Sequence, residues 1–221
     1  MSTPPQLPVY ELEDALEASF GTKGDATSRR VFIVPVSQPS SFVAFGALWP
    51  SPADLVEALF VAKGNLEEHL GAFVERMVRE EAVVELCVYP PLPRSLVDQY
   101  ASVPPYEGYE YEAPPGTPVR GMSADASVEP YSRLRDSTLW TRGDIASRHT
   151  YLSPLSDPSQ FLALGVIAPP STNVVFATRG SIVEDLGSLI AHVLREQSFV
   201  EMHANPPLAP EILARYLTPA S

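Results

Sequence analysis

The decapeptide SQPSSFVAFG, at residues 37–46, recurs as SDPSQFLALG at residues 156–165, 119 positions further along the chain. Both copies place a polar turn containing Pro and Ser before an apolar run that ends at glycine. A phrase that returns in this way indicates an internal repeat, and a repeat constrains the whole fold before any local pattern is considered.

The similarity extends well beyond this phrase. At the same spacing, residues 28–50 match residues 147–169 at 10 of 23 positions. After a three-residue deletion, residues 59–100 match residues 175–216 at 13 of 42 positions. The chain of 221 residues is therefore predicted to contain two homologous units. The predicted division is an N-terminal acidic helix or arm at 1–27, a first unit at 28–100, a linker or arm at 101–146 and a second unit at 147–221.

Each unit opens with three short runs of apolar, β-branched or aromatic residues that end at Pro, Ser or Gly, a pattern that predicts three strands. A fourth such run follows a helical segment, ends at Pro-Pro-Leu and precedes a short final helix. The runs are residues 29–37, 41–50, 57–64 and 82–90 in the first unit, and residues 148–156, 160–169, 173–180 and 198–206 in the second.

The helical segments open with a capping box, formed by Asn65 with Glu68 and by Ser181 with Glu184. Apolar residues then recur at helical spacing, which predicts one face packed on a sheet. They are Leu66, Leu70, Phe73, Val74, Met77 and Val78, and in the second unit Ile182, Leu186, Leu189, Ile190, Val193 and Leu194.

The predicted fold class is α+β, with two tandem βββαβα units, each an antiparallel sheet with helices on one face. Two homologous units in one chain resemble a fused homodimer, so we expect a pseudo-two-fold body.

The segments outside the two units carry patterns of their own. The acidic stretch at residues 9–21 predicts an amphipathic helix with Leu12, Leu16 and Phe20 facing inward. Residues 101–121 hold five prolines and no periodicity, which indicates an extended segment. Two interpretations stay open for it: a linker, or an arm anchored on the body or on a neighbouring subunit through its tyrosines. These tyrosines are Tyr106, Tyr109 and Tyr111.

The sequence offers little catalytic chemistry. The single cysteine, Cys87, excludes an internal disulfide framework and a thiolate-rich metal site, and its apolar neighbours predict a buried thiol. The four histidines lack the partners and spacing of a metal site, and no nucleotide-binding or hydrolase motif is present. We therefore predict no catalytic residue, no cofactor and no metal, so the protein is expected not to be an enzyme; a polar pocket around Cys87 or His203 would reopen that question.

Four arginines occupy matching positions in the two units. Arg29 and Arg148 open the first strand of each unit, where they are either strand-edge charges or phosphate ligands. Arg79 and Arg195 end the main helices, where they complement the helix dipole or line a contact surface.

The chain carries 27 acidic and 15 basic side chains, a formal net charge of −12. This balance disfavours a surface that neutralises phosphates along its whole length. No apolar run reaches 18 residues and the N-terminus lacks the order of a secretory signal, so we expect a cytoplasmic protein without a membrane partner.

The chain is rich in Pro, Ala and Ser (24, 23 and 22 residues) and uses 13 Arg against 2 Lys. The bias is concentrated in MSTPPQLPVY, PPYEGYEYEAPPGTP and ANPPLAPEILARYLTPAS. In this composition the chain resembles the proline-alanine-serine-rich proteins of polymycoviruses, fungal double-stranded RNA viruses. The resemblance implies a self-assembling structural protein that coats double-stranded genomic RNA within a virion, with the 101–146 arm linking subunits.

A second interpretation stays open beside this resemblance. An acidic surface also suits a bacterial intracellular binding protein, such as an immunity protein, a secretion chaperone or a regulatory adaptor, that meets a basic protein partner.

Overall fold

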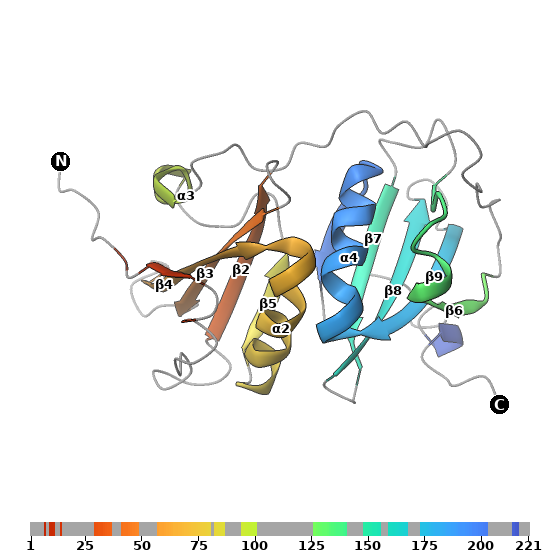
Figure 1. Ribbon diagram of the computed structural model, residues 1–221, viewed down its shortest axis with the longest axis horizontal. Helices are drawn as coiled ribbons and strands as arrows, with labels where there is room; N and C mark the ends of the chain where they lie inside the picture. The colour runs from red at the N-terminus through yellow and green to blue at the C-terminus, as the bar shows by residue number, and fades with distance from the viewer. Residues whose placement is uncertain are drawn as a thin grey trace. The chain divides into compact units, whose positions relative to one another are not determined.

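The computed structural model divides into two compact units, Met1–Glu107 and Gly108–Ser221, each of mixed α/β structure around one five-stranded sheet (Figure 1). None of the helices in the described segments has the length and apolarity needed to cross a bilayer. The structure describes residues 7, 9–11, 14, 29–36, 41–48, 57–80, 82–86, 94–100, 126–140, 148–155, 159–167, 173–202 and 214–216.

In the first unit the strand order is β1-β4-β3-β2-β5. The elements follow one another along the chain as β1 (Val9–Glu11), β2 (Arg29–Val36), β3 (Ser41–Leu48), β4 (Glu57–Asn65), α2 (Leu66–Arg79), β5 (Val83–Leu86) and α3 (Arg94–Tyr100).

In the second unit the strand order is β10-β7-β8-β9-β6, and residues 214–216 are again helical. The elements are β6 (Val128–Pro130), the 3₁₀ turn η2 (Tyr131–Arg133), β7 (Arg148–Pro154), β8 (Gln160–Ile167), β9 (Asn173–Ser181), α4 (Ile182–Arg195) and β10 (Phe199–Met202).

The sheets are mixed, which corrects the prediction of antiparallel sheets. The three central strands of each sheet are antiparallel, as predicted. Both outer strands are parallel to their neighbours: β5 to β2, β1 to β4, β10 to β7 and β6 to β9. For β5 and β10 the reason is the helix before them, because a strand–helix–strand path reverses the chain twice and returns it in the original direction.

The prediction for the main helices is confirmed. The side chain of Asn65 accepts hydrogen bonds from the backbone N–H groups of Glu67 and Glu68, and the Ser181 hydroxyl accepts one from that of Glu184. All six apolar residues predicted to face inward are buried in α4, and five of the six are buried in α2, where Val78 is partly exposed.

The reciprocal half of the capping box differs from the prediction. The N–H of Asn65 donates to Nδ1 of His69 at 3.0 Å, and the N–H of Ser181 donates to Oδ2 of Asp185 at 3.0 Å. In both units the side chain that accepts a hydrogen bond from the N–H of the N-cap residue therefore belongs to the fourth helical residue. The capping box had predicted the glutamate at the third.

Helices cover both faces of the first sheet, which corrects the prediction of helices on one face. Phe42 of β3 packs on Phe73 of α2, with ring centroids 5.8 Å apart. Since side chains alternate along a strand, Phe45 faces the other way, and its ring meets Tyr100 of α3 at 6.1 Å. The second face comprises Phe32, Val34, Val36, Val43, Phe45, Ala47, Val61, Val97 and Tyr100.

Burial on both faces explains why β2 and β3 read as unbroken apolar runs without polar alternation. The second unit follows the same rule. Its face away from α4 comprises Tyr151, Leu162, Leu164, Val166, Val174, Ala177 and Tyr216.

The glycine that closes the repeated phrase has the same surroundings in both units. Gly46 pairs with Phe60, and the register then skips one residue so that Ala47 pairs with Ala58. In the second unit Gly165 pairs with Phe176, and the register again skips one residue. Each phenylalanine ring occupies the space that a side chain on the glycine would need. The repeated phrase therefore ends in glycine because a ring and a β-bulge lie at that point.

Two findings concern the segments outside the predicted units. Val9–Glu11 form a strand paired with β4, where the sequence analysis expected the start of a helix. Those residues have β propensity and complete the open edge of β4. Residues 126–140, which the sequence analysis placed in the linker, form β6 and η2 within the second unit.

Candidate functional site

Arg29 and Arg148 fasten the ends of the two main helices. Nη1 of Arg29 donates to the backbone carbonyl of Glu80 at 3.0 Å, and Nη1 of Arg148 donates to that of Glu196. These carbonyls belong to the C-cap residues of α2 and α4, where backbone acceptors lack partners within the helix. Both guanidinium groups thus have an intramolecular role that neither interpretation from the sequence had included.

Arg79 and Arg195 lie at the last position of each main helix, and both are exposed. Nη2 of Arg79 is 2.7 Å from Oε1 of Glu75, one turn earlier on the same helix. Of the four arginines selected from the sequence, these two present their side chains to solvent. The other residues selected there, Tyr106, Tyr109, Tyr111, Cys87 and His203, lie outside the described residues.

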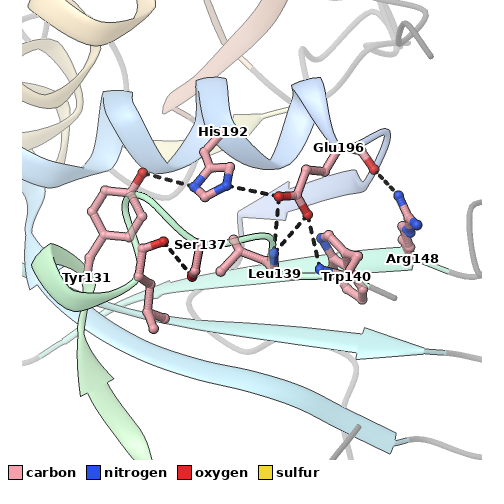
Figure 2. A network of polar contacts seen from close by, with 8 residues as sticks. Tyr131, Ser137, Leu139, Trp140, Arg148, His192 and Glu196 are labelled. Carbon is pink, nitrogen blue, oxygen red and sulfur yellow. Dashed lines mark hydrogen bonds and ion pairs between the residues drawn. The ribbon is translucent and has the colours of Figure 1, made fainter. Parts of the chain in front are cut away.

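The second unit contains a buried polar network, drawn in Figure 2, whose centre is the carboxylate of Glu196. Its side chain is 1% exposed. The backbone N–H of Leu139 lies 3.1 Å from both carboxylate oxygens, and that of Trp140 donates to Oε2 at 3.0 Å. Nε2 of His192 is 3.0 Å from Oε1. Hydrogen bonds to a charged acceptor stabilise the charged form, so three N–H donors compensate for the burial of this carboxylate.

His192 extends the network to a tyrosine. Its Nδ1 lies 3.4 Å from the hydroxyl oxygen of Tyr131, while its Nε2 faces Glu196. An imidazole that carries its proton on Nε2 donates to the carboxylate and accepts from the hydroxyl, which satisfies all three groups. The chain of carboxylate, imidazole and hydroxyl resembles an acid–base relay. However, Tyr131, His192 and Glu196 are all buried, so a substrate cannot reach them in this conformation.

The network fastens one segment, residues 126–140, which we call the strap. At its start, Oγ1 of Thr178 on β9 donates to the carbonyl of Glu129 at 2.8 Å. Further along, Nη2 of Arg135 lies 3.2 Å from Oδ1 of Asp185 on α4. At its end, the buried ring of Trp140 meets Phe176 edge-on, with centroids 5.4 Å apart. The strap is therefore held along its length by α4 and β9.

The first unit has a different pair at the positions of His192 and Glu196. There Nε of Arg76 lies 2.8 Å from Oε1 of Glu80, and the two side chains are 28% and 18% exposed. In the second unit the matching side chains are 5% and 1% exposed. A partly buried ion pair in one unit thus corresponds to a fully buried histidine–carboxylate pair in the other.

The alignment from the sequence had stopped short of the strap, although a signal was present. At the same spacing of 119, TKGD at residues 22–25 matches TRGD at residues 141–144 at three positions, and Val9 matches Val128. These two valines are the first residues of β1 and β6, which pair with the equivalent strands β4 and β9. Following the spacing towards the N-terminus would have assigned the strap to the second unit.

Among residues that the structure describes, no group of three or more His, Cys, Asp and Glu side chains is placed to hold a metal ion. Comparisons of the chain with protein-family models, with curated proteins and with solved structures gave no match.

Proposed function

We propose that this protein is a non-enzymatic structural protein that self-assembles, and that it arose by duplication of one βββαβα unit with pseudo-two-fold symmetry. The duplication is supported by features at equivalent positions: the side-chain cap of the main helix, the arginine bonded to its last carbonyl, and the glycine beneath a phenylalanine beside a bulge. Two such units in one chain give two sets of related surfaces, as a symmetric assembly requires.

The non-enzymatic part of the proposal rests on the role of the buried tyrosine, histidine and glutamate in the second unit. Tyr131, His192 and Glu196 have the chemistry of a relay, but all three are buried and bind one another or the backbone of the strap. Catalytic side chains must reach a reacting atom of the substrate. Side chains that hold one segment of a protein against another are instead buried between the two segments. The arrangement of these three residues is of the second kind.

In its specific form the proposal is a coat protein that associates with double-stranded RNA, as the compositional resemblance implies. Arg79 and Arg195 are the residues we assign to phosphate contacts, because both side chains are exposed at the helix ends. Arg79 would exchange its ion pair with Glu75 for a phosphate, whereas Arg29 and Arg148 are less exposed and bond to helix carbonyls. Phosphate contacts supply most of the sequence-independent affinity for nucleic acid, so the loss of two arginines has a measurable effect.

A second candidate function is the binding of a basic protein partner, and it rests on the charge balance. The net charge is −12, and several described arginines are engaged within the chain, including Arg76 with Glu80 and Arg135 with Asp185. An acidic surface of this kind favours fast association with a cationic surface, and salt weakens that association.

One measurement separates these functions. The purified full chain is analysed by light scattering, together with its absorbance ratio at 260 and 280 nm, at low and at high salt. Assemblies much larger than the 24.0 kDa chain support self-assembly, and nuclease-sensitive absorbance at 260 nm supports the RNA-associated form. A small, monodisperse particle free of nucleic acid at both salt concentrations would overturn self-assembly and favour the basic partner.

A variant with Arg79→Gln and Arg195→Gln tests the assigned phosphate contacts. We expect it to keep its assembled mass and lose bound nucleic acid. The matched control is Arg133→Gln, an exposed arginine on η2 that has no assigned contact role.

A further inference from the structure

We propose that His69 is a proton-sensitive cap on α2, at a position where the second unit has a different acceptor. When its imidazole is neutral, it accepts a hydrogen bond from the backbone N–H of Asn65. When the ring gains a proton, it releases that N–H and turns to the carboxylate of Glu68. This inference does not depend on the proposed self-assembly, because every group in it belongs to the first unit.

The contact that carries the inference is the hydrogen bond of 3.0 Å from the N–H of Asn65 to Nδ1 of His69. A neutral imidazole accepts only at the ring nitrogen that has no proton, so this contact requires the proton on Nε2. Nε2 itself lies 3.9 Å from Oε2 of Glu68, whose side chain is 72% exposed. The two ring nitrogens therefore have different partners, a backbone donor on one side and a solvated carboxylate on the other.

Protonation of the ring removes the acceptor. An imidazolium is a donor at both nitrogens, so its Nδ1–H and the N–H of Asn65 would face each other with no lone pair between them. The cap also lies at the positive end of the helix dipole, which disfavours a cation at that point. The carboxylate of Glu68 attracts the same cation. Protonation therefore changes the partner of the ring from the backbone of Asn65 to the side chain of Glu68.

The surroundings of His69 allow this change without unfolding. Glu67 and Glu68 are its charged neighbours on α2, and on β4 Lys63 precedes the uncharged Gly64. A Cβ atom added to Gly64 would lie 3.2 Å from Cβ of His69, so the absence of a side chain there leaves room for the cap. The side chain of His69 is 35% exposed, and a proton therefore reaches it directly from water.

The rest of the cap does not involve the imidazole. Oδ1 of Asn65 accepts from the N–H groups of Glu67 and Glu68, at 2.8 Å and 3.2 Å. These two bonds are independent of the charge on His69. Protonation is thus expected to loosen the entry into α2 while the helix itself stays folded.

The second unit has a carboxylate at the equivalent position. The N–H of Ser181 donates to Oδ2 of Asp185 at 3.0 Å, and Oδ1 of Asp185 lies 3.2 Å from Nη2 of Arg135. A carboxyl group keeps an acceptor oxygen whether or not it carries a proton, whereas an imidazolium has no acceptor. Acid is therefore expected to release this cap in the first unit and to leave it in place in the second.

The test is a pH titration of the full chain, labelled with ¹⁵N and followed by NMR. The ring ¹⁵N resonances of His69 report its tautomer and its protonation. Hydrogen exchange reports the protection of the Asn65 amide relative to an unstructured peptide at the same pH. The amide of Ser181 is the internal control, and the variant His69→Asp gives the first unit the acceptor of the second.

We expect the neutral ring of His69 to carry its proton on Nε2. As the ring becomes protonated, the protection of the Asn65 amide should fall by about five- to tenfold, which corresponds to the net loss of one hydrogen bond. Ser181 should show no such step, and His69→Asp should abolish the step at Asn65. The inference is overturned if the neutral ring carries its proton on Nδ1, or if the protection of Asn65 does not follow the protonation of His69. A step at Asn65 that persists in His69→Asp would also overturn it, because another group would then be the cause.

Discussion

The ring of Phe176 lies where a side chain on Gly165 would begin: a Cβ atom added to Gly165 would lie 1.9 Å from Cε1 of that ring. Gly46 and Phe60 have the same relationship in the first unit, with a distance of 1.8 Å. In both cases the two residues are direct partners on adjacent antiparallel strands. A glycine that lets a cross-strand ring lie flat over the backbone fixes both the register and the adjoining bulge.

Gly165→Ala is expected to lower the free energy of unfolding by about 1–3 kcal/mol, the usual range for overpacking a core. The Phe176 ring is fully buried and packs against Trp140, so it has little room to move away from the new methyl group. Urea denaturation of the full chain measures the change. Gly46→Ala is the matched variant in the first unit and should cost a similar amount, because its new Cβ would lie 1.8 Å from Cε1 of the buried Phe60 ring. Equal stability of Gly165→Ala and the parent chain would refute the contact.

Leu186→Ala is expected to destabilise the second unit by about 2–5 kcal/mol, because it opens a cavity beneath α4. The side chain of Leu186 is 0% exposed at the centre of the face that packs on the sheet. Val183 lies on the same helix and is 42% exposed, so Val183→Ala is the control and should change stability by less than about 0.5 kcal/mol. Similar thermal melting of the two variants would show that the helix is packed in another register.

The sequence predicted the helices and central strands well because their signals are local and occur twice. The apolar spacing in α4 and the cap residue Ser181 act within a few residues of one another, and the first unit repeats both. The strands β5 and β10 were predicted as the fourth strand of each unit, although their parallel direction was not. The edge strands β1 and β6 were missed because three residues such as Val9–Glu11 carry no periodicity of their own. Their conformation is set by the open edge of β4, which is distant in the sequence.

The strap network could not be predicted from patterns of this kind. Leu139 and Trp140 lie 57 and 56 positions from Glu196, and they contribute backbone N–H groups, which every residue except proline possesses. From the sequence, His192 was one of four histidines without a recognisable partner. The fold brings Tyr131 to it from 61 positions away, and one turn of helix brings Glu196 to its other ring nitrogen. The replacement of Arg76 by His192 at equivalent positions is the sequence difference that corresponds to the buried network.

Arg148→Lys is expected to destabilise the second unit by about 1–3 kcal/mol, because a buried donor to the Glu196 carbonyl is lost. Arg148 is 8% exposed, and its guanidinium also lies 6.0 Å from the centroid of the Trp140 ring. A lysine ammonium does not reproduce this planar contact. Arg195→Gln, at the exposed end of α4, is the control and should change the free energy of unfolding by less than about 0.5 kcal/mol. If Arg195→Gln were the more destabilising of the two, the assignment of Arg148 to the helix end would be wrong.

Glu196→Gln is expected to loosen the strap while α4 stays folded. With its oxygen at the Oε2 position, the amide still accepts from the N–H groups of Leu139 and Trp140, and its N–H₂ group faces Nε2 of His192. A neutral amide oxygen accepts weaker hydrogen bonds than a carboxylate does, so the strap is held less firmly. The expected loss is about 1–3 kcal/mol, concentrated in the strap. Native-state hydrogen exchange should therefore show faster exchange at these two amides and little change at Leu189 and Ile190 inside α4.

Glu80→Gln is the control that the duplication provides for this prediction. Glu80 occupies the equivalent position in the first unit, and its bond to Arg76 is partly solvated. Because this ion pair lies in the first unit and the strap in the second, Glu80→Gln should leave hydrogen exchange at Leu139 and Trp140 unchanged. Unchanged exchange at Leu139 and Trp140 in Glu196→Gln would show that the carboxylate does not hold the strap. Faster exchange there in Glu196→Gln, with no change in Glu80→Gln, would show that the carboxylate holds the strap.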